Sequence, residues 1–183
     1  MKNRTLFVLA SVAISVSMAA AQVKSVTGLK GESSATYLLT PPMHEREATS
    51  KEVFYTASLD VGSKTIQSVT AVVDVTSFDS GNSNRDSHAM EVVDALSYPE
   101  VMFTSTSIVP QGNTLVVNGK LTFHGVTSDI IAAATPDWTQ DKLVVHAVFP
   151  LSLTAFKVER PALLFIPVKD TLRFTLVAAF SLK

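Results

Sequence analysis

A dense polar stretch ten residues long contains the side chains best suited to do chemistry. It holds two Asp, two Asn, one Arg and one His, among them Asp79, Asn82, Arg85, Asp86 and His88. Carboxylate and amide oxygens are ligands for hard cations, so a metal or headgroup site is one interpretation. The other is structural, because Asn and Gly accept left-handed turns, Asp caps helices and Arg pairs with carboxylates. The spacing does not match an EF-hand loop, and turn chemistry accounts for nearly every residue, which favours the structural interpretation.

The histidines are the next candidates for a metal site. They are His44, His88, His124 and His146. No two of them have the short spacing of zinc or copper ligands, and His124 and His146 are predicted on polar, outward strand faces. The sequence also lacks a G-x-S-x-G elbow, a G-x-G-x-x-G loop and a P-loop. We therefore expect no metal site, no catalytic residue and no enzyme activity.

Composition excludes several other classes of protein. The chain has 183 residues, of which 46% are hydrophobic and 17% charged, with a net charge of −1 and no Cys. This length suits a single domain, and so much apolar content rules out a disordered chain. Near-neutrality argues against a nucleic-acid-binding surface. The absence of Cys excludes disulfides, thiolate zinc sites, iron–sulfur clusters and Cys nucleophiles.

The first 21 residues have the features of a secretory signal peptide. Lys2 and Arg4 precede an uncharged apolar stretch, residues 5–18, and three alanines ending at Ala21 form an A-x-A cleavage pattern. A membrane-spanning helix needs roughly 20 apolar residues, so this stretch is too short to be one. We expect cleavage near Ala21 and a periplasmic or secreted mature chain, residues 22–183, without a stable membrane span.

Alternation of apolar and polar residues dominates the mature chain and predicts strands. The clearest segments, each with one apolar face, are 115–124, 142–151 and 171–182. Weaker segments of the same kind are 34–39, 51–59, 66–75, 102–109 and 128–134. A short helix is predicted from Ser87 to about Leu96, capped by Asp86 or Ser87, and a helical turn at 153–158.

Eight such strands with one or two short helices predict an all-β protein, either a barrel or a sandwich. A closed barrel of eight strands can be filled by its own side chains or can hold one small ligand. The apolar residues expected to point into it are Phe103, Leu115, Val117, Leu121, Phe123, Leu143, Val145, Phe149, Phe174, Leu176 and Phe180. Alternation predicts only that they face inward, so a packed core and a ligand cavity both stay open.

Three sequence blocks resemble the YceI-like family. They are FDSGNSNRDSH at 78–88, YPEVMF at 98–103 and GKLTFHGVT at 119–127. The corresponding family patterns are D-T/S-G-N-x-x-R-D-x-H, Y-P-x-x-x-F and G-x-L-T-x-H-G-V-T, and all three occur here in the same order at comparable spacing. The chain is therefore identified as a member of this family, with its YceI-like domain at 22–183.

The resemblance implies a lipocalin-like barrel of eight antiparallel strands around an apolar tunnel. In some relatives that tunnel holds a long isoprenoid chain, such as a polyprenyl lipid or a quinone tail, and no other cofactor is implied. The inward apolar residues would then form the lipid-binding wall. The polar residues of the family blocks are expected to have a mainly structural role, and they are Asp79, Asn82, Arg85, Asp86, His88 and His124. Segments 31–51 and 153–167 depart from the common pattern, which is expected to reshape the tunnel mouth.

Two functions from different classes remain. The first is a non-catalytic carrier or sequestering protein of the bacterial periplasm that holds an isoprenoid or similar apolar lipid. Each buried methylene contributes about 0.8 kcal/mol, so a long chain can bind without polar contacts. The second is a structural or interaction protein of the envelope, whose barrel is filled by side chains and binds no ligand. A monomer and a homodimer are both compatible with the sequence.

Overall fold

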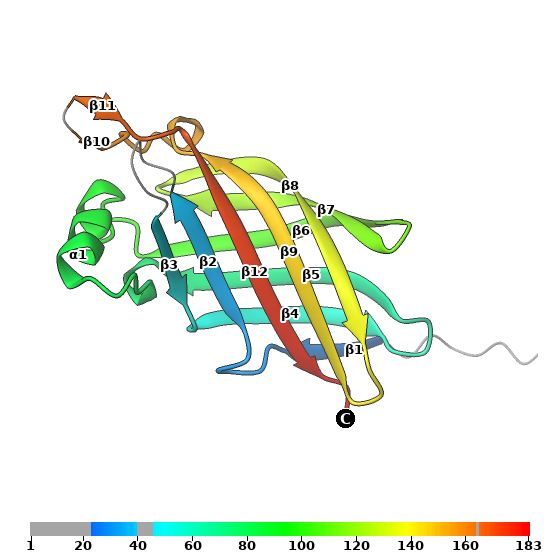
Figure 1. Ribbon diagram of the computed structural model, residues 1–183. Coiled ribbons are helices and arrows are strands. Elements are labelled where there is room, and N and C mark those ends of the chain that lie inside the picture. Colours follow the sequence, from blue (N-terminus) through cyan, green and yellow to red (C-terminus); the bar gives the residue numbers. More distant parts are fainter. Residues whose placement is uncertain (1–22, 40–45, 164) are drawn as a thin grey trace, which may run out of the picture.

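One curled, antiparallel sheet of ten strands makes up most of the structure, a computed structural model that describes residues 23–39, 46–163 and 165–183 (Figure 1). In order across the sheet the strands are β1 (Val23–Thr27), β4 (Val53–Asp60), β5 (Thr65–Asp74), β6 (Glu100–Gln111), β7 (Thr114–Phe123), β8 (Val126–Trp138), β9 (Lys142–Ser152), β12 (Thr171–Ser181), β2 (Ser34–Leu39) and β3 (Arg46–Ser50). The signal peptide expected at 1–21 and His44 lie outside the described residues.

The remaining elements are short. Strands β10 (Ala162–Leu163) and β11 (Ile166–Pro167) pair only with each other. Helix α1 (Ser83–Val92) lies at one end of the curled sheet, and η1 (Val75–Ser77) and η2 (Thr154–Phe156) are single 3-10 turns. The prediction of an all-β, barrel-like fold is confirmed. All eight predicted strands are present, and the structure adds β1, β3 and the β10–β11 pair.

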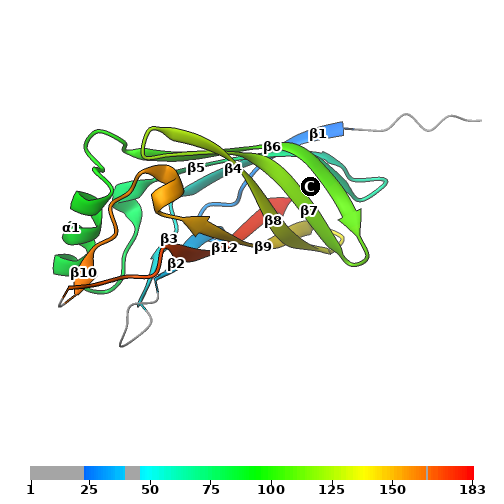
Figure 2. The same cartoon turned by 90° about the horizontal axis from the view of Figure 1, so that it is seen from above.

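The sheet curls so strongly that it faces itself. Seen from above, β4, β5 and β6 form one layer, while β2, β3 and β12 form the layer opposite (Figure 2). The apolar faces predicted from alternation point into the space between the layers, as the buried positions of β7 show at Val117, Leu121 and Phe123. A period of two places alternate side chains on opposite faces, so each strand supplies one wall of the interior.

The two edge strands, β1 and β3, lie along a seam where the sheet returns to itself. Directly after β1, the Gly28 N–H donates to the Tyr55 carbonyl at 2.7 Å, and the Leu29 N–H donates to the Ala179 carbonyl at 2.7 Å. These two bonds connect β4 with β12. Between the same layers, the Tyr55 hydroxyl donates to the Ser34 carbonyl at 3.1 Å. The seam is therefore closed at this end by a few specific hydrogen bonds.

A second set of bonds closes the seam near α1. Thr49 and Asp79 exchange backbone hydrogen bonds of 2.9 and 3.1 Å. The hydroxyls of Ser50 and Ser77 share a hydrogen bond of 2.6 Å. Both contacts join β3 to the chain that leaves β5. Unpaired edges are sites where foreign strands add, so closing both ends protects the sheet.

The predicted helix is present, but its predicted bounds were wrong. It begins at Ser83 because Asn82 is extended, with φ of −146°, and its side-chain oxygen accepts from the Arg85 N–H at 3.1 Å. Asn82 is therefore the cap, whereas Asp86 bonds elsewhere. The helix ends at Val92 because Asp94 takes a left-handed φ of 46°, which does not continue a right-handed helix. The predicted turn at 153–158 is confirmed as η2.

The seam bond of Tyr55 provides a test of this closure. Tyr55 is buried, and burial raises the pKa of its hydroxyl, so the group stays protonated and donates. We expect Tyr55→Phe to lower the free energy of unfolding by about 0.5–1.5 kcal/mol, as measured by urea denaturation. Tyr98→Phe, which removes a hydroxyl from an exposed side chain, should change it by less than about 0.5 kcal/mol. Equal losses in both variants would refute a role for this bond.

Candidate functional site

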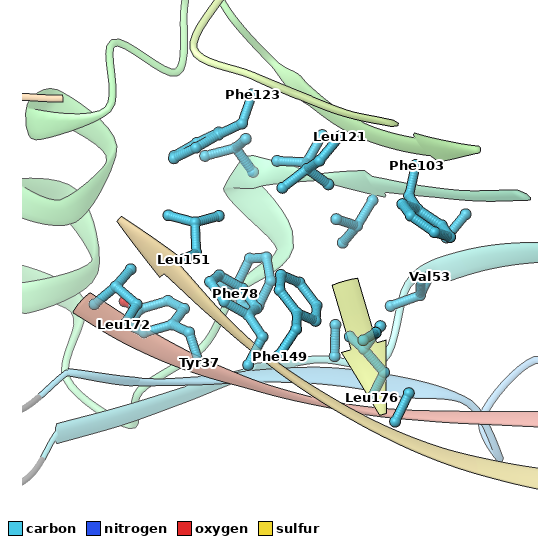
Figure 3. A pocket seen from close by; sticks show the side chains of 18 of the residues that line it. Tyr37, Val53, Phe78, Phe103, Leu121, Phe123, Phe149, Leu151, Leu172 and Leu176 are labelled. Atoms are coloured by element: carbon cyan, nitrogen blue, oxygen red, sulfur yellow. The ribbon is translucent and has the colours of Figure 1, made fainter. Parts of the chain in front are cut away.

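The curled sheet surrounds an apolar cavity of about 290 Å³. This volume is close to the lower end of typical ligand pockets, roughly 300–1,000 Å³. Phe103, Leu121 and Phe123 project into it from one wall, facing Phe149, Leu151 and Leu176 on the other (Figure 3). The barrel interior is therefore not filled by its own side chains.

All the predicted wall residues except Leu143 line this cavity. They are Phe103, Leu115, Val117, Leu121, Phe123, Val145, Phe149, Phe174, Leu176 and Phe180. Leu143 is 0% exposed and packs with Val26, Leu59 and Phe180 in a buried core cluster. Alternation correctly predicts that Leu143 points inward, but it carries no information on how far along the interior the cavity extends.

The aromatic side chains leave the cavity open because they lie against its walls. The rings of Phe149 and Phe174 stack with centroids 5.2 Å apart and an interplanar angle of 10°. Phe103 lies on Gly119 of the neighbouring strand, so close that a Cβ added there would be 2.3 Å from the ring. Gly119 thus provides the room in which the Phe103 ring lies flat against β7.

The cavity opens beside α1, where its lining becomes polar. Exposed lining residues mark the opening, and they are Arg46, Glu47 and His88. Half-buried Ser80, Arg85 and Asp86 complete the polar rim. We call this end the mouth. Segments 31–51 and 153–167, which depart from the common family pattern, contribute Arg46, Glu47 and Pro161 to the lining at or near this end.

The polar residues of the rim hold one another in place. The Arg85 guanidinium donates from Nε to the Ser80 hydroxyl and from Nη2 to the Ser80 carbonyl, each at 2.8 Å. Asp86 accepts from the N–H of Ser80 at 3.2 Å and from its hydroxyl. Asp79 accepts from the Gly81 N–H at 2.6 Å. Arg85 therefore bonds to Ser80 instead of pairing with a carboxylate, and the stretch forms a defined turn before α1.

The histidines of the described residues lie apart from one another. His88 is exposed and lies 3.7 Å from Glu91, and His146 is exposed on β9. The outward placement predicted for His124 was wrong. The backbone of His124 has a φ of 49°, so its side chain does not follow the alternation of the strand. Its Nδ1 hydrogen-bonds to the Phe156 carbonyl at 3.0 Å, and its ring packs edge-on against that of Tyr98, with the ring centroids 4.8 Å apart.

The described residues contain neither a metal-binding cluster nor a membrane-spanning helix. No three His, Asp or Glu side chains in this part of the chain gather in an arrangement that could hold a metal ion. None of its helices is both long and apolar enough to cross a membrane.

One lining residue absent from the sequence prediction is Tyr37 of β2. Its ring lies 5.4 Å from that of Phe78 and 6.1 Å from that of Phe174, near the mouth. Burial raises the pKa of the Tyr37 hydroxyl, the nearby Asp86 charge raises it further, and Arg85 opposes the shift. The alternation of 34–39 contained the signal, because it places Tyr37 on the same strand face as buried Ala35.

The family model for the YceI-like domain matches residues 10–180. The chain belongs to the YceI-like family. A UPF0312 protein of Vibrio campbellii is 46% identical over 69 residues, which is 36% of each chain. Protein YceI of Escherichia coli O157:H7 is 31% identical over 88 residues, 47% of this chain and 46% of that protein. The match therefore spans less than half the length of these curated relatives.

Solved structures share the YceI-like fold. BcnA of Burkholderia cenocepacia superposes with a TM-score of 0.75 at 22% identity, covering 83% of this chain and 98% of that one. A polyisoprenoid binding domain from Saccharophagus degradans, implicated in plant cell wall breakdown, gives a TM-score of 0.65 at 11% identity, covering 87% and 99%. The Campylobacter jejuni YCEI protein gives 0.62 at 15%, covering 100% and 99%. These likenesses confirm the fold.

The contact of Gly119 with Phe103 gives a testable consequence for the cavity wall. In Gly119→Ala the new methyl group would meet the Phe103 ring at 2.3 Å and the Thr104 carbonyl oxygen at 2.6 Å. We expect a loss of about 1–3 kcal/mol in unfolding free energy, measured in urea, because the ring or the strand must move. In the control Gly62→Ala, the nearest atom is Asp60 Oδ1 at 3.4 Å, and the change should stay within about 0.5 kcal/mol. An equally stable Gly119→Ala variant would show that the ring is not constrained there.

Proposed function

We propose that this protein is an exported, non-catalytic carrier or sequestering protein that holds an isoprenoid, or a similarly long apolar lipid, in its cavity. The observation that carries the proposal is an apolar cavity, open at one end, inside a YceI-like fold. A structural neighbour described as a polyisoprenoid binding domain supports this class of ligand. The N-terminal signal pattern of the sequence supports export to the periplasm.

The chemistry of the lining determines how such a lipid would lie. The walls are built almost entirely from hydrocarbon side chains such as Leu121, Phe149 and Leu176, which offer no hydrogen bond. Burial of each methylene is worth about 0.8 kcal/mol, so an apolar tail gains affinity with every carbon that enters. Polar lining groups are concentrated at the mouth. The tail would therefore fill the interior, with its head at the α1 end.

The mouth has hydrogen-bond donors suited to a head with acceptor oxygens. Arg85 uses Nε and Nη2 on Ser80, and a guanidinium has five N–H donors in all. The Tyr37 hydroxyl lies close enough to Asp86 and Arg85 for their charges to shift its pKa. A quinone carbonyl or a phosphate oxygen is an acceptor of the kind these donors would bind. An isoprenoid quinone or a polyprenyl phosphate therefore fits better than a plain hydrocarbon.

The alternative function is a structural envelope protein with a filled barrel. It requires a packed interior, and a cavity of about 290 Å³ argues against it. The placement of the inward-facing rings also argues against a filled barrel. They lie along the walls, whereas in a packed core they would occupy the centre.

The direct test is native mass spectrometry of the mature protein, residues 22–183, purified from the envelope of its host. We expect a one-to-one adduct that extracts into organic solvent as an isoprenoid lipid. Emptied protein should take up an added quinone with a long isoprenoid tail, and the same spectra report whether it is a monomer or a homodimer. Bare protein that takes up neither the quinone nor the hydrocarbon squalene would refute the proposal.

Substitution of Tyr37 tests the orientation of the lipid. Tyr37→Phe removes one donor at the mouth, so the quinone should bind about two- to tenfold more weakly, the value of one hydrogen bond. Squalene, which has no acceptor, should bind equally well to both proteins. Tyr98→Phe is the control, because Tyr98 does not line the cavity. If Tyr37→Phe weakened squalene as much as quinone, the effect would lie in packing and the assignment of the head to the mouth would be wrong.

A further inference from the structure

The β10–β11 hairpin presents two large apolar side chains to solvent. Phe165 is 100% exposed and Ile166 is 55% exposed. Phe165 also has a left-handed φ of 68°, a conformation that is uncommon for a bulky residue. Adjacent, exposed apolar side chains at the end of a projecting element are typical of a contact surface.

The base of this hairpin belongs to the rim of the cavity. Pro161, which directly precedes β10, lines the cavity. The Val168 N–H, directly after β11, donates to the Pro161 carbonyl at 2.9 Å, and the Val168 side chain is buried. In both ribbon views the hairpin lies at the same end of the molecule as α1 (Figures 1 and 2). The exposed tip therefore projects at the end where the cavity opens.

Basic side chains flank the tip. Lys157, Arg160 and Lys169 are exposed, and none of them forms an ion pair with a carboxylate of the described residues. Within 157–169 the single acidic residue is Glu159, so this segment has a net charge of +2, three basic residues less one acidic. Asp170 follows at the base. There the Ser152 hydroxyl and the Thr154 N–H hydrogen-bond to its carboxylate and lower its pKa.

We propose that the hairpin tip, formed by Phe165 and Ile166, inserts into the surface of an anionic lipid bilayer. Lys157, Arg160 and Lys169 then contact the lipid headgroups. Aromatic and aliphatic side chains flanked by cations are the combination that binds the interface of a charged membrane, because apolar burial and attraction to anionic lipids add together.

This docking goes beyond lipid binding and gives the cavity a source for its ligand. With the hairpin in the interface, the mouth lies at the membrane, and a lipid tail enters the cavity without crossing water. A protein partner that covered the same tip would bind without regard to the lipid charge. The dependence on anionic lipid therefore separates these two occupants.

The test is flotation of the mature protein with vesicles of phosphatidylcholine, alone or mixed with phosphatidylglycerol. We expect binding to the anionic vesicles, and a partition about tenfold lower for the double variant Phe165→Ser/Ile166→Ser. The matched control is Phe54→Ser/Ile131→Ser, which removes similar side chains that are 68% and 64% exposed on β4 and β8. This control should float like the wild type. Lys157→Gln/Lys169→Gln should remove most of the preference for anionic vesicles.

Two outcomes would overturn the proposal. One is a wild-type protein that ignores anionic vesicles, and the other is an equal loss in the hairpin variant and its control. Urea midpoints should match the wild type in both double variants, because all four side chains are exposed. Uptake of the quinone from detergent is measured in parallel. Failure of uptake contradicts the carrier function, whereas failure of flotation with normal uptake contradicts only the docking.

Discussion

The seam of the curled sheet is the constraint on which the cavity depends. A sheet of ten strands has two edges, and here each edge is held at a different end. Gly28 and Leu29 connect β4 to β12 at one end, and Thr49 with Asp79 connects β3 to the chain after β5 at the other. Because both walls are parts of one hydrogen-bonded sheet, their separation is set by the backbone and not by contact between facing side chains. An apolar space can therefore persist without collapsing, at the cost of the packing contacts that a filled core would gain.

The same constraint explains the polar stretch before α1. Asp79 contributes its backbone to the seam, and its carboxylate turns the chain at Gly81. Ser80, directly after it, is held by Arg85 and Asp86. These residues close the barrel and, by doing so, place a guanidinium and a carboxylate at the mouth. The structural and the functional interpretation of this stretch are therefore compatible, since a rigid turn is what fixes polar groups beside an opening.

The interior walls could be predicted from sequence because alternation is a property of the backbone. All eight predicted strands are present, and their predicted apolar residues point inward. The errors fall where local hydrogen bonds override a pattern. Helix α1 starts at the residue whose side chain caps it, Asn82, and His124 leaves the strand alternation because its backbone is left-handed. Leu143 shows a different limit, because the position at which a core ends and a cavity begins depends on packing between strands distant in sequence. The short strands β1 and β3 were missed because five residues hold too few alternations to recognise.

A carrier for long apolar lipids faces one physical difficulty, which is the transfer itself. A tail that crosses water exposes every methylene, at about 0.8 kcal/mol each, so an isoprenoid of many carbons would leave a bilayer very slowly. A cavity that recognises only hydrocarbon does not solve this, because affinity at the end of the path does not lower the barrier along it. A mouth held against the membrane does lower the barrier, since the tail then moves between two apolar environments. The placement of the polar rim and the exposed β10–β11 tip at the same end of this sheet is consistent with that route, and Val168 provides a buried anchor from which such a tip can project.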